Sequence, residues 1–171
     1  GFIGLEMAEN LHQLGIQVSI VEMSDQMMNP IDYSMAAIVH QHLKTKDVEF
    51  YLNDGVASFS QLENNRLEVT LKSGRKLVED MVILSIGVRP DNQLAKNADL
   101  VIGEMGGIKV NDFLQTSDED IYAVGDAIEK ESPITKKPFL AYLAGPANRQ
   151  GRICADNIIN GNTTKYKGSI S

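Results

Sequence analysis

Apolar residues near the start of the chain recur at the spacing of an amphipathic helix. Separations of four, four and three positions place four side chains on one helical face: Ile3, Met7, Leu11 and Leu14. Gly15 follows, where a left-handed backbone can end a helix without a steric penalty. Residues 17–22 (QVSIVE) are short and rich in β-branched side chains, which predicts a buried parallel strand.

The pattern changes twice between residues 30 and 86. A helix is predicted over residues 33–44, after the breaker pair Asn29-Pro30, and a strand over residues 48–51. Three short runs, separated by Asn-Asn and Ser-Gly, then predict an antiparallel meander: residues 56–60, 66–71 and 75–78. The continuous apolar run at 81–86 (MVILSI) predicts a fully buried strand.

A proline stop at residues 87–90 (GVRP) predicts a domain boundary between residues 88 and 89. Beyond it we expect strands at residues 108–110 and 121–124, the second of them buried and stopped by Gly125-Asp126. Pro146 suits the first turn of a helix that continues through residues 148–160 and ends before Gly161. The sequence therefore predicts two α/β segments joined near residue 88.

The composition argues for a globular protein that binds neither nucleic acid nor membrane. Apolar residues make up 43%, and 16 basic against 23 acidic residues give a net charge of -7, with no cationic excess to neutralise phosphates. No apolar run approaches the roughly 18 residues that span a bilayer. A single cysteine, Cys154, favours a reducing, cytoplasmic compartment. Because the chain starts inside a glycine motif without Met, we expect it to be part of a longer protein.

The first four residues, Gly1-Phe2-Ile3-Gly4, combine with Glu22 into a pattern suited to a dinucleotide. Glycine backbone can approach a pyrophosphate, a helix N-terminus offers free N–H groups, and an acid about 20 positions later can accept ribose hydroxyls. The same residues also suit a helix that packs tightly on a sheet, with Glu22 as a solvated strand end. These residues alone leave both interpretations open.

The run at residues 116–126 (TSDEDIYAVGD) narrows the choice, because it matches the second flavin-binding signature of flavoproteins with two dinucleotide domains. In that signature the glycine turns the chain close to the cofactor, and the aspartate can accept a hydrogen bond from a ribityl hydroxyl. A strand that ends in an ordinary Gly-Asp turn is the alternative, but the whole pattern is much less common than its last two residues.

Together these segments resemble the pyridine nucleotide-disulfide oxidoreductases, most closely the branch of coenzyme A-disulfide reductase, NADH oxidase and NADH peroxidase. Residues 1–11, 82–90, 116–127 and 143–156 carry the resemblance. It implies an α/β fold: a Rossmann-like three-layer NAD(P)-binding domain with an antiparallel β-meander, residues 1–88, lacking its first strand. Residues 89–171 would be the returning half of an FAD-binding domain. The full-length protein is expected to be a homodimer.

The resemblance places nicotinamide-dinucleotide contacts in the first half. Gly1 and Gly4 match the second and third glycines of the pyrophosphate motif, and Glu22 matches the ribose-binding acid. Phe2 matches an aromatic position near the nicotinamide side of the flavin. The full set of implied contacts is Gly1, Phe2, Ile3, Gly4, Glu22, Met23, Ile86 and Gly87.

Flavin contacts are implied mainly in the second half. Gly125 and Asp126 match the turn at the ribityl chain, and Leu143 and Ala144 match the segment beneath the pyrimidine end of the flavin. Glu6 matches a carboxylate near the flavin edge; an ordinary exposed helix Glu is an equal alternative for it.

The redox chemistry of this branch uses a cysteine from a half that this chain does not contain. We therefore expect no catalytic residue among these 171 and interpret Cys154 as a small buried hydrophobe. No Cys-x-x-Cys is present, which argues against the thioredoxin reductase branch. His40 and His42 are two apart on a helix and do not share a face, so we expect no metal site.

Two function classes follow. In the first, hydride passes from NADH through FAD to a cysteine-linked acceptor: coenzyme A disulfide, another disulfide, oxygen or peroxide. In the second, the chain is a non-catalytic NAD-binding sensor or assembly module. An upstream glycine motif and a cysteine near residue forty of the intact protein would favour the enzyme.

Three further expectations concern selectivity, activity and packing. Residues 23–26 (MSDQ) contain no Arg or Lys, and Asp25 adds a negative charge, so NADH should be preferred over NADPH. By itself the chain should lack reductase and oxidase activity and retain FAD poorly. Residues 1–88 should be the better packed unit, while strand edges beyond residue 89 should seek a partner chain.

Overall fold

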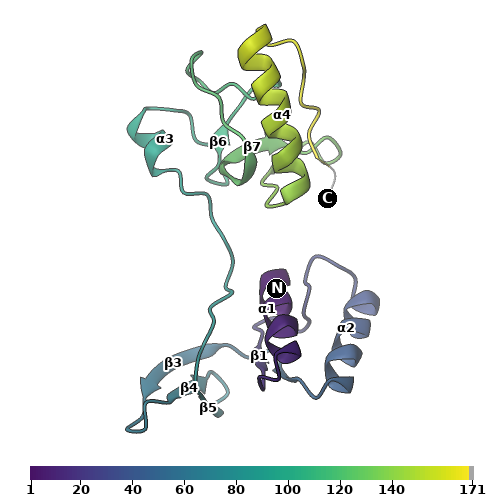
Figure 1. The fold of residues 1–171 in the computed structure, drawn as a ribbon, viewed down its shortest axis with the longest axis vertical. Helices are drawn as coiled ribbons and strands as arrows, with labels where there is room; N and C mark the ends of the chain where they lie inside the picture. Colours follow the sequence, from purple (N-terminus) through teal and green to yellow (C-terminus); the bar gives the residue numbers. More distant parts are fainter. Residues whose placement is uncertain (170–171) are drawn as a thin grey trace. The chain divides into compact units, whose positions relative to one another are not determined.

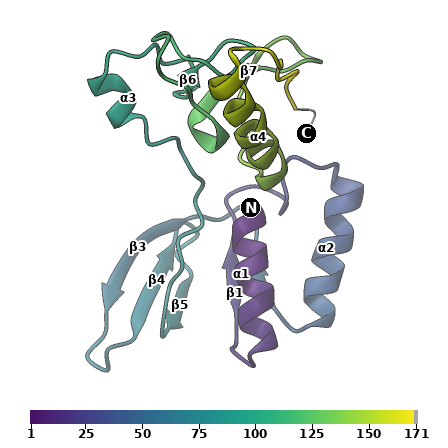
Figure 2. The ribbon, with the colours of Figure 1, turned by 45° about the horizontal axis from the view of Figure 1, so that its top comes forward.

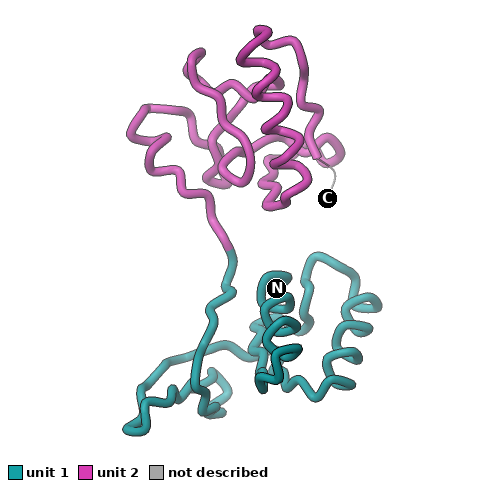
Figure 3. The backbone as a smooth tube through the Cα atoms, viewed as in Figure 1, with its two compact units in different colours: residues 1–87 teal, residues 88–171 magenta. Residues whose placement is uncertain are grey.

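A computed structural model describes residues 1–169, which form two compact units (Figure 1). The first unit spans Gly1–Gly87 and the second begins at Val88 (Figure 3). The elements of the first unit are α1 (Phe2–Gln13), β1 (Ser19–Val21), α2 (Tyr33–Thr45), β2 (Glu49–Tyr51), β3 (Val56–Gln61), β4 (Leu67–Leu71) and β5 (Lys76–Glu79).

The elements expected before residue 80 are all present. Strands β1 and β2 pair in parallel, with Ile20 opposite Phe50, as a strand–helix–strand unit requires. Strands β3, β4 and β5 form the antiparallel meander, and Figure 2 shows them running side by side. The two tight turns of the meander contain Asn65 and Gly74, whose φ angles of 64° and 88° explain why Asn and Gly occupy them.

The strand expected at residues 81–86 is wrong. This segment is extended but pairs with no described strand, and Leu84 and Ile86 are 62% and 87% exposed. An apolar run indicates that a segment can be buried as a strand, but a strand also needs a neighbouring backbone with which to exchange hydrogen bonds. None of the described residues supplies that backbone here.

The predicted helix at the start of the chain is confirmed, but its apolar face is largely exposed. Ile3 and Leu14 lie open to solvent, and Ala8 is the buried residue of α1. The parallel sheet beneath α1 has two strands, β1 and β2, so it covers a narrow strip of the helix. Gly15 takes a positive φ just after the helix, as expected from its position.

The second unit is built around one long helix. Its elements are α3 (Gln93–Asn97), β6 (Ile108–Lys109), the 3-10 turn η1 (Gly125–Ala127), β7 (Ile128–Glu131), β8 (Pro138–Phe139) and α4 (Ala144–Asn160). Strand β7 pairs in parallel with β6 and antiparallel with β8. The buried strand expected at residues 121–124 is wrong, because Tyr122 forms an isolated bridge to Gln115 and the segment is half-buried.

A hydrophobic core lies in the second unit, where Leu114, Ile128, Cys154 and Tyr166 pack together. Asn157 of α4 is fully buried beside them; its amide donates to the carbonyls of Phe113 and Thr164 at 2.9 Å each. Large apolar side chains are buried in both units, Met27 and Leu71 in the first and Leu114 in the second, so the expectation that residues 1–88 form the better packed unit is not confirmed. The long helix α4 provides a broad surface for burial, which the two-stranded parallel sheet of the first unit does not.

None of the helices within residues 1–169 combines the length and the apolar character that crossing a bilayer requires.

Candidate functional site

The first candidate site lies at the N-terminus of α1. The amides of a first helical turn have no partner within the helix, so they can bind an anion. A Cβ on Gly1 would meet no atom within 4 Å, which leaves its backbone open to close approach by a ligand. A Cβ on Gly4 would lie 3.3 Å from Cβ of Ser85, so glycine at this position lets α1 pack closely on the segment at 81–86.

Glu22 follows the last residue of β1 and faces the start of α1. Its Oε2 lies 3.3 Å from the nitrogen of Gly1, and its Oε1 accepts the backbone N–H of Ser24 at 3.0 Å. Partial burial acts to raise the pKa of Glu22, but the backbone N–H of Ser24, which donates to its carboxylate, helps to hold the pKa below its usual value. The carboxylate is therefore ionised at neutral pH and can accept hydrogen bonds from hydroxyl groups.

A buried histidine supports the loop that follows Glu22. Nε2 of His40, on α2, accepts the backbone N–H of Met27 at 3.1 Å, and Met27 is almost fully buried. The His40 ring packs against Phe50 of β2, with ring centroids 5.6 Å apart. Sequence reasoning assigned His40 no role; the available signal was its spacing of four from Ala36, which places both on the buried face of α2.

The other proposed nucleotide contacts lie around this site with exposed side chains. Phe2 and Ile3, in the first turn of α1, and Ile86 are exposed. Met23 is 69% exposed, and Gly87 has a φ of 105° that suits glycine. Glu6 is exposed on α1. The structure thus brings Gly1 close to Glu22, and Gly4 close to the segment that leads to Ile86.

The second candidate site is the Gly-Asp turn of the second unit. Gly125 has a φ of 75°, and its N–H donates to Oε1 of Gln150 at 2.6 Å. Asp126 is exposed in the same turn, and Leu143 and Ala144 begin α4. Sequence reasoning missed Gln150, although its spacing of four from Cys154 places it on the buried face of α4.

Asp126 and Arg89 both act on the hydroxyl of Tyr142, which precedes α4. Burial raises the pKa of Tyr142, and the negative charge of Asp126 raises it further, while Arg89 acts in the opposite direction. Sequence reasoning assigned neither Tyr142 nor Arg89 a role.

Across residues 1–169, His, Cys, Asp and Glu side chains form no group of three arranged to hold a metal ion. Cys154 is buried in the core of the second unit, as expected, and burial raises the pKa of its thiol. A buried, protonated thiol is a poor nucleophile.

Comparison with known families decides the assignment. The family model described as pyridine nucleotide-disulphide oxidoreductase matches residues 1–147. The chain belongs to this family. The resemblance inferred from the motifs is confirmed, and so is the α/β fold class, because solved structures of members superpose on nearly the whole chain.

Individual members of the family show how much of a complete protein this chain represents. It is 38% identical over 159 residues to an NADH oxidase of Methanocaldococcus jannaschii, covering 92% of this chain and 35% of that protein. It is 29% identical to a coenzyme A disulfide reductase of Staphylococcus aureus, in a match that covers 99% of this chain and 38% of that protein. The chain superposes on the crystal structure of reduced Bacillus anthracis CoADR-RHD with a TM-score of 0.90 and 54% sequence identity. This match covers 99% of the present chain and 30% of the other. The chain thus spans about a third of the length of these relatives.

Proposed function

We propose that this chain forms part of a flavin-dependent oxidoreductase in which hydride passes from NADH to FAD and then, as electrons, to a cysteine-linked acceptor. The acceptor class is coenzyme A disulfide, another disulfide, oxygen or peroxide, in keeping with relatives named NADH oxidase and coenzyme A disulfide reductase. The intact enzyme is a cytoplasmic homodimer in this proposal.

The observation that carries the proposal is the approach of Glu22 to Gly1. The residues fit NADH: an open glycine backbone and free helix amides suit its pyrophosphate, and an ionised carboxylate 3.3 Å from Gly1 suits its adenosine ribose. Met23, Ile86 and Gly87 complete the proposed edge of the nucleotide site, with Phe2 and Ile3 at the helix start. Residues 1–88 act as the nicotinamide-binding domain.

The cofactor proposed to bind the second unit is FAD. The positive φ of Gly125 lets backbone approach a cofactor closely, and Asp126 offers an exposed carboxylate to a ribityl hydroxyl. Leu143 and Ala144 line the same cofactor at the start of α4. FAD supplies the two-electron redox chemistry when bound, and these side chains orient it.

Selectivity between NADH and NADPH in the full-length enzyme tests the site. A 2′-phosphate would meet the negative charges of Glu22 and Asp25, so NADH is preferred. The change Glu22→Ala removes the acceptors for the ribose hydroxyls and relieves the repulsion of a 2′-phosphate. The ratio of kcat/KM with NADH to kcat/KM with NADPH should therefore fall by about tenfold. Steady-state kinetics with NADH and with NADPH, at fixed ionic strength, measure this ratio for the wild type and the variant.

The matched control is Glu63→Ala, which removes one negative charge from an exposed turn of the meander. It should leave the ratio unchanged. A full-length enzyme that prefers NADPH, or one in which Glu22→Ala leaves the ratio as it was, would contradict the proposed site.

A further inference from the structure

An open groove of about 820 Å³ in the second unit gathers a large share of the basic side chains of the chain. Five of the 16 Lys and Arg residues line it, although the chain as a whole carries a net charge of -7. They come from separate stretches of sequence that the fold brings together: Lys109, Lys130, Lys136, Lys165 and Lys167. None of the residues assigned above to NADH or FAD lines this groove.

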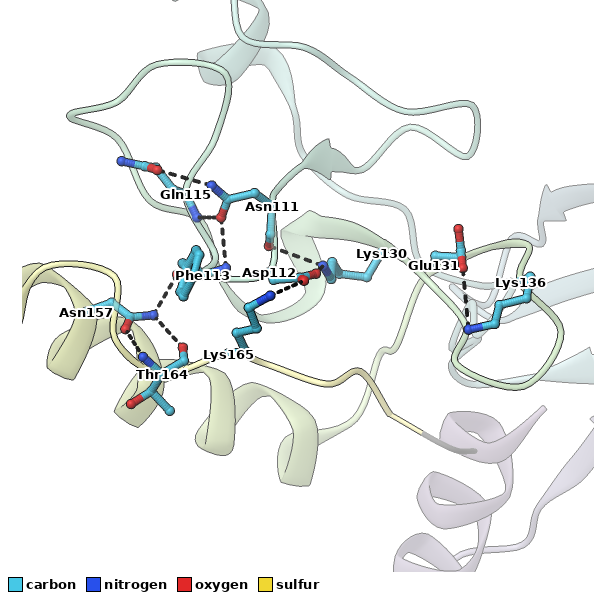
Figure 4. Close-up of polar contacts among 10 residues, drawn as sticks. All are labelled: Asn111, Asp112, Phe113, Gln115, Lys130, Glu131, Lys136, Asn157, Thr164 and Lys165. Atoms are coloured by element: carbon cyan, nitrogen blue, oxygen red, sulfur yellow. Dashed lines mark hydrogen bonds and ion pairs between the residues drawn. The ribbon is translucent and has the colours of Figure 1, made fainter.

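The carboxylates in the groove do not balance these lysines. Asp112 is shared, with Nζ of Lys130 at 3.0 Å from one oxygen and Nζ of Lys165 at 3.6 Å from the other (Figure 4). One negative charge thus faces two positive ones. Lys136 pairs loosely with Glu131 at 3.9 Å. A further carboxylate, Glu129, is buried: its Oε2 accepts the backbone N–H of Met105 at 2.8 Å, and its Oε1 has no partner among the described residues.

The remaining two lysines are available to a ligand. Within the described part of the chain, Lys109 and Lys167 make no ion pair, and both are exposed. Lys130, by contrast, is held in place, because its side chain is 17% exposed and its Nζ also donates to the carbonyl of Asn111 at 3.2 Å. The groove therefore combines one cation held by two partners with exposed cations that make no ion pair among the described residues, which is suited to an anion with more than one charge.

We propose that this groove binds a small ligand carrying two or more linked phosphate groups. Lysine binds phosphate as a point charge, and the groove volume lies within the range of small-molecule sites, about 300–1,000 Å³. The half-buried ring of Phe113, with Lys165 Nζ 5.6 Å from its centroid, adds an apolar surface beside the charges. A nucleoside diphosphate and inorganic pyrophosphate share the chemistry that the groove recognises.

An extended acidic peptide fits the groove less well. Peptides commonly bind by adding a strand to an open sheet edge, where backbone hydrogen bonds supply the affinity. Both edge strands of this sheet, β6 and β8, have only two residues, and Pro138 of β8 has no N–H to donate. A compact anion needs no such edge.

Titration calorimetry of the chain with inorganic pyrophosphate tests the proposal. We expect saturable binding that weakens with added salt. The double variant Lys109→Gln/Lys167→Gln should raise the Kd about tenfold, since two charge-assisted contacts are lost. The matched control Lys46→Gln/Lys96→Gln removes two exposed lysines elsewhere and should leave the Kd unchanged. Circular dichroism establishes that each variant is folded.

A variant that should bind pyrophosphate more tightly strengthens the test. Asp112→Asn removes the carboxylate that Lys130 and Lys165 share, so the Kd for pyrophosphate should fall several-fold. A parallel titration with adenosine diphosphate distinguishes the sources of the phosphate, because tighter binding than pyrophosphate indicates a nucleotide. No saturable pyrophosphate binding, or a Kd that the double variant leaves unchanged, would overturn the proposal; the second result would place the anion elsewhere, for example at α1.

Discussion

The two units of this chain bury their apolar side chains in different places. In the second unit, Leu114, Ile128, Cys154 and Tyr166 form a cluster against α4. In the first unit, large apolar side chains of α1 and of the segment at 81–86 remain exposed, while Leu71 of the meander is fully buried. Apolar and polar positions alternate along helices of both units. Burial depends on a second layer being available to cover the pattern.

The largest expected effect contrasts a core leucine with an exposed one. Leu114→Ala should lower the free energy of unfolding of the second unit by about 3 kcal/mol, because Leu114 is fully buried and its truncation leaves a cavity. Leu84→Ala, at the exposed segment of the first unit, should change stability by less than about 0.5 kcal/mol. Amide hydrogen exchange resolves the two units separately. Equal losses of stability in Leu114→Ala and Leu84→Ala would contradict the difference in burial between these two leucines.

Thiol chemistry tests whether the core of the second unit is closed. Cys154 is buried and burial raises the pKa of its thiol, so a thiol reagent should react only when the unit opens. We expect a rate roughly a hundredfold below that of an exposed cysteine on the same helix, which corresponds to about 3 kcal/mol of protection. The control is Cys154→Ala combined with Ala155→Cys at the neighbouring exposed position. Similar rates would show that α4 does not seal the core.

A smaller effect is expected at His40 in the first unit. His40→Leu leaves the buried N–H of Met27 without its acceptor, and should destabilise the first unit by about 1.5 kcal/mol. His40→Gln offers an amide oxygen and should recover part of the loss. His42→Leu, at an exposed position of the same helix, is the control. Thermal unfolding measures all three; a neutral His40→Leu would mean that Met27 is not held by this contact.

The smallest effect concerns acid stability in the second unit. The Lys130 hydrogen bond and charge lower the pKa of Asp112 below its usual value. A lowered folded-state pKa contributes stability above the ordinary aspartate pKa of about 4, and that contribution is lost as the pH falls through the folded value. The Tm of Asp112→Asn should therefore fall less between pH 7 and pH 3 than that of the wild type. Parallel curves would show that the pair contributes nothing measurable.

Most local elements could be predicted from the sequence because their signals are local. The meander followed from alternating residues and from Asn65 and Gly74 at positions that require positive φ. The two strands predicted on either side of α2 are also present, and the structure shows that they pair in parallel. Glu22 could be placed beside the glycine motif because both its spacing and the strand–helix arrangement are set by sequence.

What the sequence determined, then, is where the three longer helices α1, α2 and α4 lie, which residues are apolar, and the motifs that identify the family. Tertiary structure alone decided which apolar runs are buried: residues 81–86 have the composition of a core strand, yet lack a strand to pair with among the described residues. It also decided the contacts between distant residues, such as Gln150 with Gly125 and two lysines with Asp112. Secondary structure depends on neighbours in sequence, whereas burial and shared charges depend on neighbours in space.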